Sequence, residues 1–287
     1  MDKNSGWQHT LEQVLNTRLR RRSQIGGGDF AEAFKVECDD GRSLFVKTHR
    51  NPPIDFFSTE ATGLSWLRDA QSLAVPEVVA VSDAPPFLAL EWIELGDAVA
   101  DTEENFGRGL AALHRGGYRC FGRTDAKTTG SLAVPNDPTE HWPEFYSRCR
   151  LLPLIDRARE RQALPQKVLG DLEKLAANIS DLDVPVEPPA LLHGDLWAGN
   201  RVVDSHGRSW LIDPAAHGGH REFDLAMMKL FGGFGEACFS AYHEVYPLAP
   251  GWQERVPLHQ LAPLIVHAVK FGGPYVDGTR QAVSRFV

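Results

Sequence analysis

The pattern of apolar and polar residues changes character part-way along the chain. In the first ninety residues, short apolar runs with polar ends predict β-strands, and two segments with apolar residues every three or four positions predict helices. A turn with Asp40 and Gly41 separates the first two strands, because glycine readily takes the positive φ of a tight hairpin. The predicted elements are a helix over residues 7–19, strands over 34–38 and 43–48, a helix over 55–69, and strands over 78–81 and 87–93.

Beyond Glu94 the helical period dominates, and strand-like runs return at one place only. There, Arg201–Asp204 and Ser209–Asp213 flank a Ser-His-Gly turn and predict a short hairpin. The predicted helices cover residues 103–115, 139–160, 165–178, 222–244 and 256–271. We therefore predict an α+β fold of two lobes, a strand-rich lobe over residues 1–93 and a mainly helical lobe over residues 94–287, with a cleft between them.

The composition is that of a folded globular protein. Of the 287 residues, 43% are apolar and 24% are charged, which supplies enough apolar surface for a packed core and argues against intrinsic disorder. No apolar run approaches the roughly 20 residues that cross a bilayer, and the first thirty residues lack the apolar stretch of a secretion signal. We therefore expect a cytoplasmic protein without a membrane partner.

Charge and cysteine spacing argue against two further classes of protein. A formal net charge of −8 makes nucleic acid an unexpected partner, because binding to phosphates needs a basic face. The one basic run, Arg18 with Arg20 to Arg22, is interpreted as the solvated end of the first helix. The cysteines show no paired spacing, so we expect reduced thiols rather than a zinc site or a disulfide framework. They are Cys38, Cys120, Cys149 and Cys238.

Residues 191–214 carry the strongest chemical signal. Asp195 and Asn200 are five positions apart, and Asp213 lies at the end of the predicted hairpin, which would return it to the other two. Phosphoryl transfer needs such a set, with one carboxylate for the attacking hydroxyl and an amide oxygen and a second carboxylate for Mg²⁺. Protein kinases keep this Asp-to-Asn interval in H-R-D-x-x-x-x-N, although here Gly194 replaces the arginine. The alternative is that Asp195 ends a strand and Asn200 fills a turn. The order of three such groups between strands favours phosphoryl transfer.

An independent signal comes from the first lobe. On a helical wheel, Glu60 lies inside the apolar arc of the predicted helix over residues 55–69, so its carboxylate needs a buried partner. Lys47 ends the apolar run over residues 44–46 and has the same need. We predict that the two form the lysine–glutamate ion pair that presents an ammonium to the α- and β-phosphates of ATP. The alternative, two unrelated charges that reach solvent, is common for lysine but less so for a glutamate within an apolar stripe.

Several other polar positions have ordinary interpretations. The glycine turn over residues 26–29 is suited to phosphates through its backbone N–H groups, but such a turn alone is weak evidence. His193 is interpreted as a brace of the catalytic loop, and Asp224 as a residue that holds this loop from the start of a helix. His217 and His220 have H-x-x-H spacing, but zinc needs three or four ligands and no partner cluster is near them, so we predict no metal site there.

Together these motifs resemble the fructosamine kinase family, also called ketosamine-3-kinases, a branch of the aminoglycoside phosphotransferase-like and protein kinase-like fold. The resemblance covers essentially the whole chain. The Leu-Trp-Ala-Gly-Asn continuation after Asp195 and the Gly-His-Arg-Glu block over residues 219–222 are much more specific than the general kinase signature. The segments that carry the resemblance are 27–29, 45–47, 91–93, 142–146, 192–200, 213–215, 219–226 and 231–234.

The resemblance implies ATP-dependent phosphorylation of the 3-hydroxyl of a ketoamine, the adduct of a sugar with an amine or a protein lysine. The phosphate makes the adduct unstable, so the amine is restored and a glycated protein is deglycated. Asp195 would be the catalytic base, and Asn200 and Asp213 would bind Mg²⁺. The implied ATP-binding residues are Gly27, Gly28, Asp29, Lys47, Glu60, Glu91 and Ile93, and the implied substrate contacts are Trp197 and His220.

Two alternatives stay open at this point. One is a related kinase for another hydroxylated amine, such as an aminoglycoside or choline, and the other is a non-catalytic nucleotide-binding scaffold. The sequence argues against the scaffold, since every member of the catalytic set is present. The expected acceptor is a small ketoamine or a glycated protein lysine, with the ketose left open, and a monomer is the expected state. Redox control at the glycine turn is not expected, because Asp29 and Phe30 stand where some relatives have a cysteine.

Overall fold

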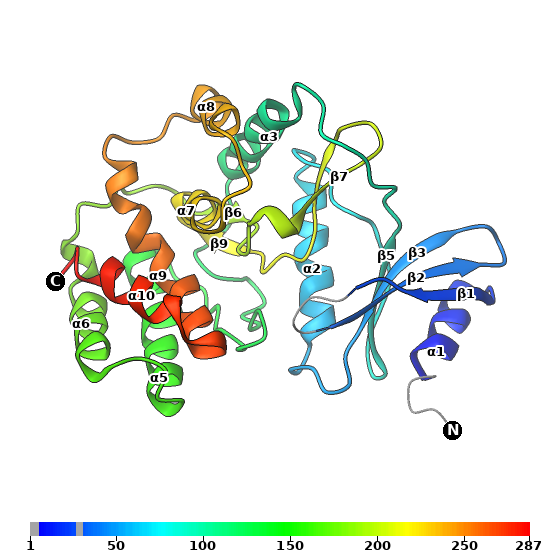
Figure 1. Cartoon of the computed structure of the whole chain (residues 1–287), viewed down its shortest axis with the longest axis horizontal. Coiled ribbons are helices and arrows are strands. Elements are labelled where there is room, and N and C mark those ends of the chain that lie inside the picture. The colour runs from blue at the N-terminus through cyan, green and yellow to red at the C-terminus, as the bar shows by residue number, and fades with distance from the viewer. Residues whose placement is uncertain (1–5, 27–30) are drawn as a thin grey trace.

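The computed structural model describes residues 6–26 and 31–287, which form two lobes side by side (Figure 1). The elements of the N-terminal lobe are α1 Gly6–Leu15, β1 Leu19–Gln24, β2 Glu32–Cys38, β3 Ser43–Thr48, α2 Phe56–Asp69, β4 Val78–Asp83 and β5 Pro86–Glu91. The strands form one antiparallel sheet in the order β1-β2-β3-β5-β4. Helix α2 lies between this sheet and the second lobe, and α1 lies at the far side (Figure 1).

Alternation along the central strands places Lys47 on the face of the sheet toward the cleft. On β5, Phe87 and Ala89 belong to the apolar cluster with α1, whereas Leu88 and Leu90 pack in the cluster with α2. The neighbouring β3 follows the same rule, because successive side chains of a strand point to opposite faces. Its Val46 lies in the cluster with α1, and Lys47 lines the cavity between the lobes.

The second lobe is mainly helical and carries two small two-stranded sheets, β6 with β9 and β7 with β8. Its helices are α3 Thr102–Gly116, α4 Trp142–Tyr146, α5 Leu152–Glu160, α6 Gln166–Ala177, α7 Glu222–Phe231, α8 Glu236–Val245, α9 Trp252–Phe271 and α10 Pro274–Val283. Its strands are β6 Ala190–Leu192, β7 Arg201–Val203, β8 Ser209–Leu211 and β9 His217–Gly219, and its short helical turns are η1 Ser147–Leu151, η2 Ile179–Asp181 and η3 Ala198–Asn200. The predicted two-lobed α+β architecture is confirmed.

One apolar cluster crosses from lobe to lobe and fixes their relative placement. It joins Leu64 of α2 and Leu90 of β5 to Leu110 of α3, and to Leu196 and Leu211 on either side of the β7–β8 hairpin. All five side chains are almost fully buried. The segment that carries Asp195 is therefore packed against the helix that carries Glu60.

Four details of the chain differ from the sequence prediction. The first helix ends at Leu15, and the arginines at 20–22 lie in β1, an edge strand whose charged side chains reach solvent. The predicted helix over 139–160 contains the π-helical turn η1. The predicted helix over 222–244 is interrupted after Phe231, where Gly232 and Gly233 take positive φ values of 71° and 87°. Strands β6 and β9 were not predicted, since three-residue strands are too short to show a period. Helix α10 was not predicted either.

The cysteine prediction is confirmed for all four residues, each of which is a free thiol. Cys38, Cys149 and Cys238 are buried, and Cys120 is half-buried. Over residues 6–26 and 31–287, none of the helices combines the length and the apolar character that a membrane span requires.

Candidate active site

A cavity of about 800 Å³ lies between the two lobes, where the sequence predicted a cleft. Lys47 of β3 and Glu60 of α2 line it from the N-terminal lobe. Asp195, Asn200 and Asp213 line it from the second lobe. Five side chains predicted from two unconnected parts of the sequence thus share one cavity.

Lys47 is held by carboxylates from both lobes. Its Nζ donates a hydrogen bond to Glu60 Oε1 at 2.8 Å and another to Asp213 Oδ1. The side chains of Lys47 and Glu60 are only 9% and 10% exposed. Burial alone would lower the pKa of Lys47, but the charges of the two carboxylates raise it above its usual value, so the ammonium stays charged. The predicted Lys47–Glu60 ion pair is confirmed.

Asp195 lies in the loop after β6, and the preceding position in this loop requires glycine. Gly194 has φ of +80°, and a Cβ there would lie 2.3 Å from the carbonyl oxygen of Ala215. A side chain at 194 would therefore meet the backbone of the neighbouring segment. This explains why glycine stands where protein kinases have the arginine of their motif.

Asp224 fixes the same loop from the first turn of α7. Its Oδ2 accepts a hydrogen bond from the backbone N–H of His193 at 2.7 Å, and its Oδ1 accepts one from Gly194 N–H at 2.9 Å. Burial raises the pKa of Asp224, but hydrogen bonds and the charge of His114 outweigh this effect and lower the pKa. The ring of His193 is 2.9 Å from the carbonyl oxygen of Ile212. Both residues have the loop-holding positions that the sequence predicted.

Asp195 and Asn200 contact each other directly. The amide nitrogen of Asn200 donates to the backbone oxygen of Asp195 at 2.8 Å and to its carboxylate oxygen Oδ2 at 3.1 Å. Burial raises the pKa of Asp195 to about 6, and the charge of Asp213 adds to this rise, while the hydrogen bond from Asn200 opposes it. A carboxyl group with this pKa is mostly ionised at pH 7 and can accept a proton.

The oxygens of Asn200 and Asp213 suit a hard divalent cation. Mg²⁺ prefers carboxylate and carbonyl oxygens, and it usually keeps few protein ligands when phosphates supply the rest. Asn200 directs its amide nitrogen toward Asp195, so its amide oxygen faces away from that carboxylate. Asp213 takes a left-handed backbone, φ 55°, and leaves its side chain 40% exposed in the cavity. The donor set therefore fits Mg²⁺ bound together with nucleotide phosphates.

The other residues predicted to bind ATP either lie outside the described residues or do not line the cavity. Gly27, Gly28 and Asp29 lie outside the described residues. Glu91 and Ile93 are not among the residues that line the cavity. The carboxylate of Glu91 accepts a hydrogen bond from the backbone N–H of Glu77 at 3.1 Å, so this side chain holds the sheet edge. The backbone of Ile93 forms no hydrogen bond with any described residue, which leaves its N–H and C=O for a ligand.

Trp197 lines the same cavity as Asp195, and its role as a substrate contact stays a prediction. Its side chain is 41% exposed, and its ring meets Phe231 edge-on with centroids 6.2 Å apart. A Cβ at Gly199 would lie 2.3 Å from this ring, so the glycine makes room for it. The exposed part of the indole is therefore available to a bound molecule.

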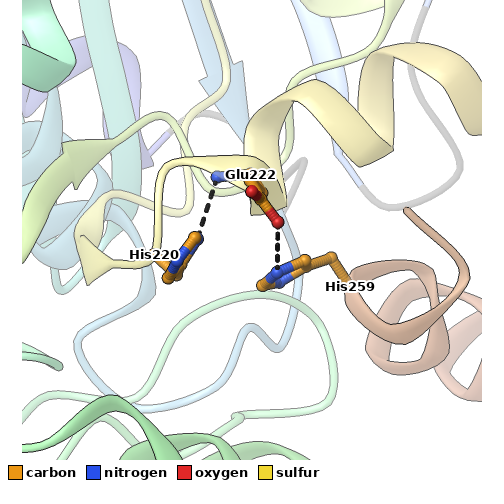
Figure 2. A group of neighbouring side chains, drawn as sticks. All are labelled: His220, Glu222 and His259. Carbon is orange, nitrogen blue, oxygen red and sulfur yellow. Dashed lines mark hydrogen bonds and ion pairs between the residues drawn. The ribbon is translucent and has the colours of Figure 1, made fainter. Parts of the chain in front are cut away.

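His220 does not line the cavity; it is 1% exposed and belongs to a buried cluster with Glu222 and His259 (Figure 2). Burial and the neighbouring His259 lower the pKa of His220 to about 4. The prediction that no further potential metal ligands lie near His220 is wrong. His259 is distant in the sequence, but its ring stacks on that of His220 with centroids 5.0 Å apart. One ligand atom from each of the three side chains lies within 4.8 Å of the other two.

The carboxylate of Glu222 is already paired with two cationic or polar neighbours, Arg255 and His259. Arg255 donates to both of its carboxylate oxygens, from Nε at 2.9 Å and from Nη2 at 2.5 Å. We therefore assign the cluster in Figure 2 as a buried polar brace between α7 and α9.

Sequence reasoning missed several polar residues of the second lobe that line the cavity, among them Arg150, His217 and Lys270. Arg150 lies in η1, which the helix prediction could not show. His217 stands three residues before the predicted contact His220. Its Nδ1 is 2.8 Å from the carbonyl oxygen of Ala215. The sequence could have indicated His217 through its position, because it directly follows Asp213-Pro214-Ala215-Ala216.

This fold is that of kinase-like phosphotransferases. A macrolide 2′-phosphotransferase of solved structure superposes with a TM-score of 0.65 over 98% of this chain and 97% of its own, at 17% identity, which shows the fold alone.

The chain itself belongs to the fructosamine kinase family, whose model matches residues 3–287. A crystal structure from Thermobifida fusca that carries the name fructosamine-3-kinase has a TM-score of 0.89 and 38% identity, covering 98% of this chain and 99% of its own. A protein of Synechocystis sp. that carries the name ketoamine kinase is 32% identical over 97% of this chain and 96% of its own. A chloroplastic protein-ribulosamine 3-kinase of Oryza sativa subsp. japonica is 35% identical, over 98% and 82%. The chain is therefore an ATP-dependent phosphotransferase.

Proposed function

We propose that this kinase transfers the γ-phosphoryl group of ATP to the 3-hydroxyl of a ketoamine. The observation that carries the proposal is the meeting of Lys47, Glu60 and Asp213 at one end of the cavity with Asp195 and Asn200 beside them. Relatives named ketoamine kinase and protein-ribulosamine 3-kinase supply the acceptor class. Phosphorylation at this hydroxyl would make the adduct unstable and restore the amine.

In this proposal Lys47 binds the α- and β-phosphates, and Glu60 keeps its ammonium in place. Asn200 and Asp213 would hold Mg²⁺, which would supply positive charge beside the phosphates when bound. Because the Lys47 ammonium already contacts Asp213, the phosphate-binding cation and the metal-binding carboxylate are positioned by each other. Little side-chain movement is then needed when the nucleotide binds.

Asp195 acts as the general base. It accepts the proton of the acceptor hydroxyl while that oxygen attacks the γ-phosphorus, and the bond from this phosphorus to the bridging oxygen breaks to release ADP. Asn200 orients the Asp195 carboxylate through its amide N–H, and Asp224 holds the loop beneath it. The backbone of Ile93 would contact adenine, the turn at Gly27, Gly28 and Asp29 would cover the phosphates, and Trp197 would contact the acceptor.

The acceptor, rather than the phosphoryl donor, distinguishes this proposal from a kinase for aminoglycosides or choline. A coupled assay of ADP release with ATP and Mg²⁺ tests it on N-substituted 1-deoxyfructosyl, ribulosyl and erythrulosyl amines, with kanamycin and choline as comparison acceptors. We expect at least one ketoamine to be consumed far faster than either comparison compound, with the phosphate on the 3-hydroxyl by NMR. Faster turnover of kanamycin or choline would contradict the proposed acceptor, and phosphate on another hydroxyl would contradict the proposed position.

A further inference from the structure

Arg150 is a buried cation that has only neutral partners. Its side chain lies within η1, and the residue is 5% exposed. The guanidinium donates to the carbonyl oxygens of Pro135 at 2.7 Å and Cys149 at 2.9 Å, and to the amide oxygen Oδ1 of Asn136 at 2.7 Å. Within residues 6–26 and 31–287, no carboxylate lies within ion-pair distance of it, although buried charges are normally paired.

The position of Arg150 connects this unpaired charge to the active site. Arg150 lines the cavity, and so does Lys270 near the end of α9. Among the described lining residues, Glu60, Asp195 and Asp213 supply all the carboxylates. Glu60 and Asp213 are engaged by Lys47, and Asp195 is the proposed base. The part of the cavity lined by Arg150 and Lys270, which we call the acceptor end, therefore has two cations. None of the described carboxylates that line the cavity forms an ion pair with either of them.

The neighbouring residues do not neutralise Arg150. Its guanidinium lies over the ring of Phe145, 4.5 Å from the centroid, where a cation is attracted but keeps its charge. His217 stays neutral, because burial together with the charge of Arg150 lowers its pKa to about 3. A π-helical turn is uncommon and is often found at functional sites, which agrees with a role in binding for a residue inside η1.

We propose that Arg150, assisted by Lys270, binds a carboxylate on the amine half of the acceptor. This inference rests on the proposed function and predicts, within its substrate class, a preference for ketoamines whose amine half carries an unblocked carboxylate. A glycated lysine within a protein chain has its own carbonyl in a peptide bond and lacks this group. A bound carboxylate would accept charge-assisted hydrogen bonds from the buried guanidinium. It would thereby supply the anionic partner that Arg150 lacks among the described residues.

A matched pair of acceptors tests this inference on the unmodified enzyme. N-(1-deoxyfructosyl)glycine carries a carboxylate where N-(1-deoxyfructosyl)glycinamide carries a neutral amide. We expect kcat/KM to be about tenfold or more higher for the acid, with most of the difference in KM, since the carboxylate binds away from the reacting hydroxyl. Equal kcat/KM for the two compounds, or a preference for the amide, would overturn the inference while leaving the ketoamine kinase function intact. If neither compound is phosphorylated while another ketoamine is, the inference also fails.

Variants separate carboxylate binding from a purely structural role of Arg150 in holding residues 135–136. Arg150→Gln should bring the acid-to-amide ratio of kcat/KM close to one, and Lys270→Met should lower the ratio by a smaller factor. Lys270 is exposed, so its variant keeps the test available if Arg150→Gln fails to fold. Arg148→Gln is the matched control, because Arg148 lies in the same turn but pairs with Glu144 on the surface. A ratio that stays unchanged in both Arg150→Gln and Lys270→Met would refute carboxylate binding.

Discussion

Each end of the cavity has a buried cation, Lys47 at one end and Arg150 at the other, and the two cations have different kinds of partners. At the nucleotide end, Lys47 contacts two carboxylates of the chain, and their charges raise its pKa above the usual value despite burial. At the acceptor end, Arg150 contacts carbonyl and amide oxygens only, and burial lowers its pKa to about 10. Both cations stay charged at neutral pH, but only Lys47 has an anionic partner within the described chain.

This difference separates a preorganised site from a site that its ligand completes. In the proposed function, Lys47 would have to stay in place while nucleotides bind and leave, and Glu60 and Asp213 supply the anions that hold it. Arg150 is held by dipoles, which position a guanidinium without cancelling its charge. An anion that binds there would supply the opposite charge that none of the described side chains supplies to Arg150.

The largest effect should follow from a change at Asp195, where the two ends of the cavity meet. Asp195→Asn removes the proposed base and should lower kcat by about 10³-fold. The fold should persist, because burial disfavours the charge of this carboxylate and the amide is neutral. Steady-state ADP release and a thermal melt measure the two quantities. Asp97→Asn, in an exposed loop, is the control. Retention of kcat within tenfold in Asp195→Asn would exclude Asp195 as the base.

The next effect concerns the paired cation. Lys47→Met leaves Glu60 without its partner in a buried position, which should cost about 3–5 kcal/mol in the free energy of unfolding and weaken ATP turnover strongly. Adding Glu60→Gln should recover part of the stability but none of the activity. Urea unfolding and kcat/KM for ATP report the two outcomes. A double variant less stable than Lys47→Met would contradict the view that an unpaired Glu60 charge is the cause.

The contrast between the two cations also explains how much the sequence could predict. Lys47 and Glu60 can be recognised because each interrupts a regular apolar pattern, one in a strand and one in a helix. An ion pair between them can therefore be predicted from the sequence alone. Asp195 and Asn200 have a fixed spacing because one short loop carries both. The lobes and most helices follow from the same periods.

Arg150 could not be found in this way. In a continuous helix over residues 139–160 it reads as one more basic residue beside Arg148. Only the π-helical turn η1, together with contacts to residues 135 and 136, turns it inward. The pairing of β6 with β9, which sets His217 beside the loop of Asp195, depends on strands of three residues and likewise leaves no periodic trace.

A smaller effect should appear in the pH dependence. Asp195 must be ionised to accept a proton, so kcat/KM should fall as the pH drops below about 6, the pKa to which burial raises this carboxyl. The charge of Lys270 lowers the pKa of Asp195. Lys270→Met should therefore raise this pKa and move the acid limb to higher pH. Lys174→Met, exposed on α6, serves as the control, and an acid limb that moves to lower pH in Lys270→Met would contradict the assignment.

The smallest effect is expected two residues from Arg150. Arg148 and Glu144 form an ion pair at 2.5 Å with side chains 60% and 46% exposed, and solvent screens such pairs. Arg148→Gln should therefore leave the melting temperature within about 1 °C of the parent. It should also leave ketoamine turnover unchanged, since Arg148 does not line the cavity. A loss of activity in Arg148→Gln comparable to that in Arg150→Gln would show that the whole turn η1, rather than the buried charge it carries, governs acceptor binding, and the distinction between the two ends of the cavity would then lose its basis.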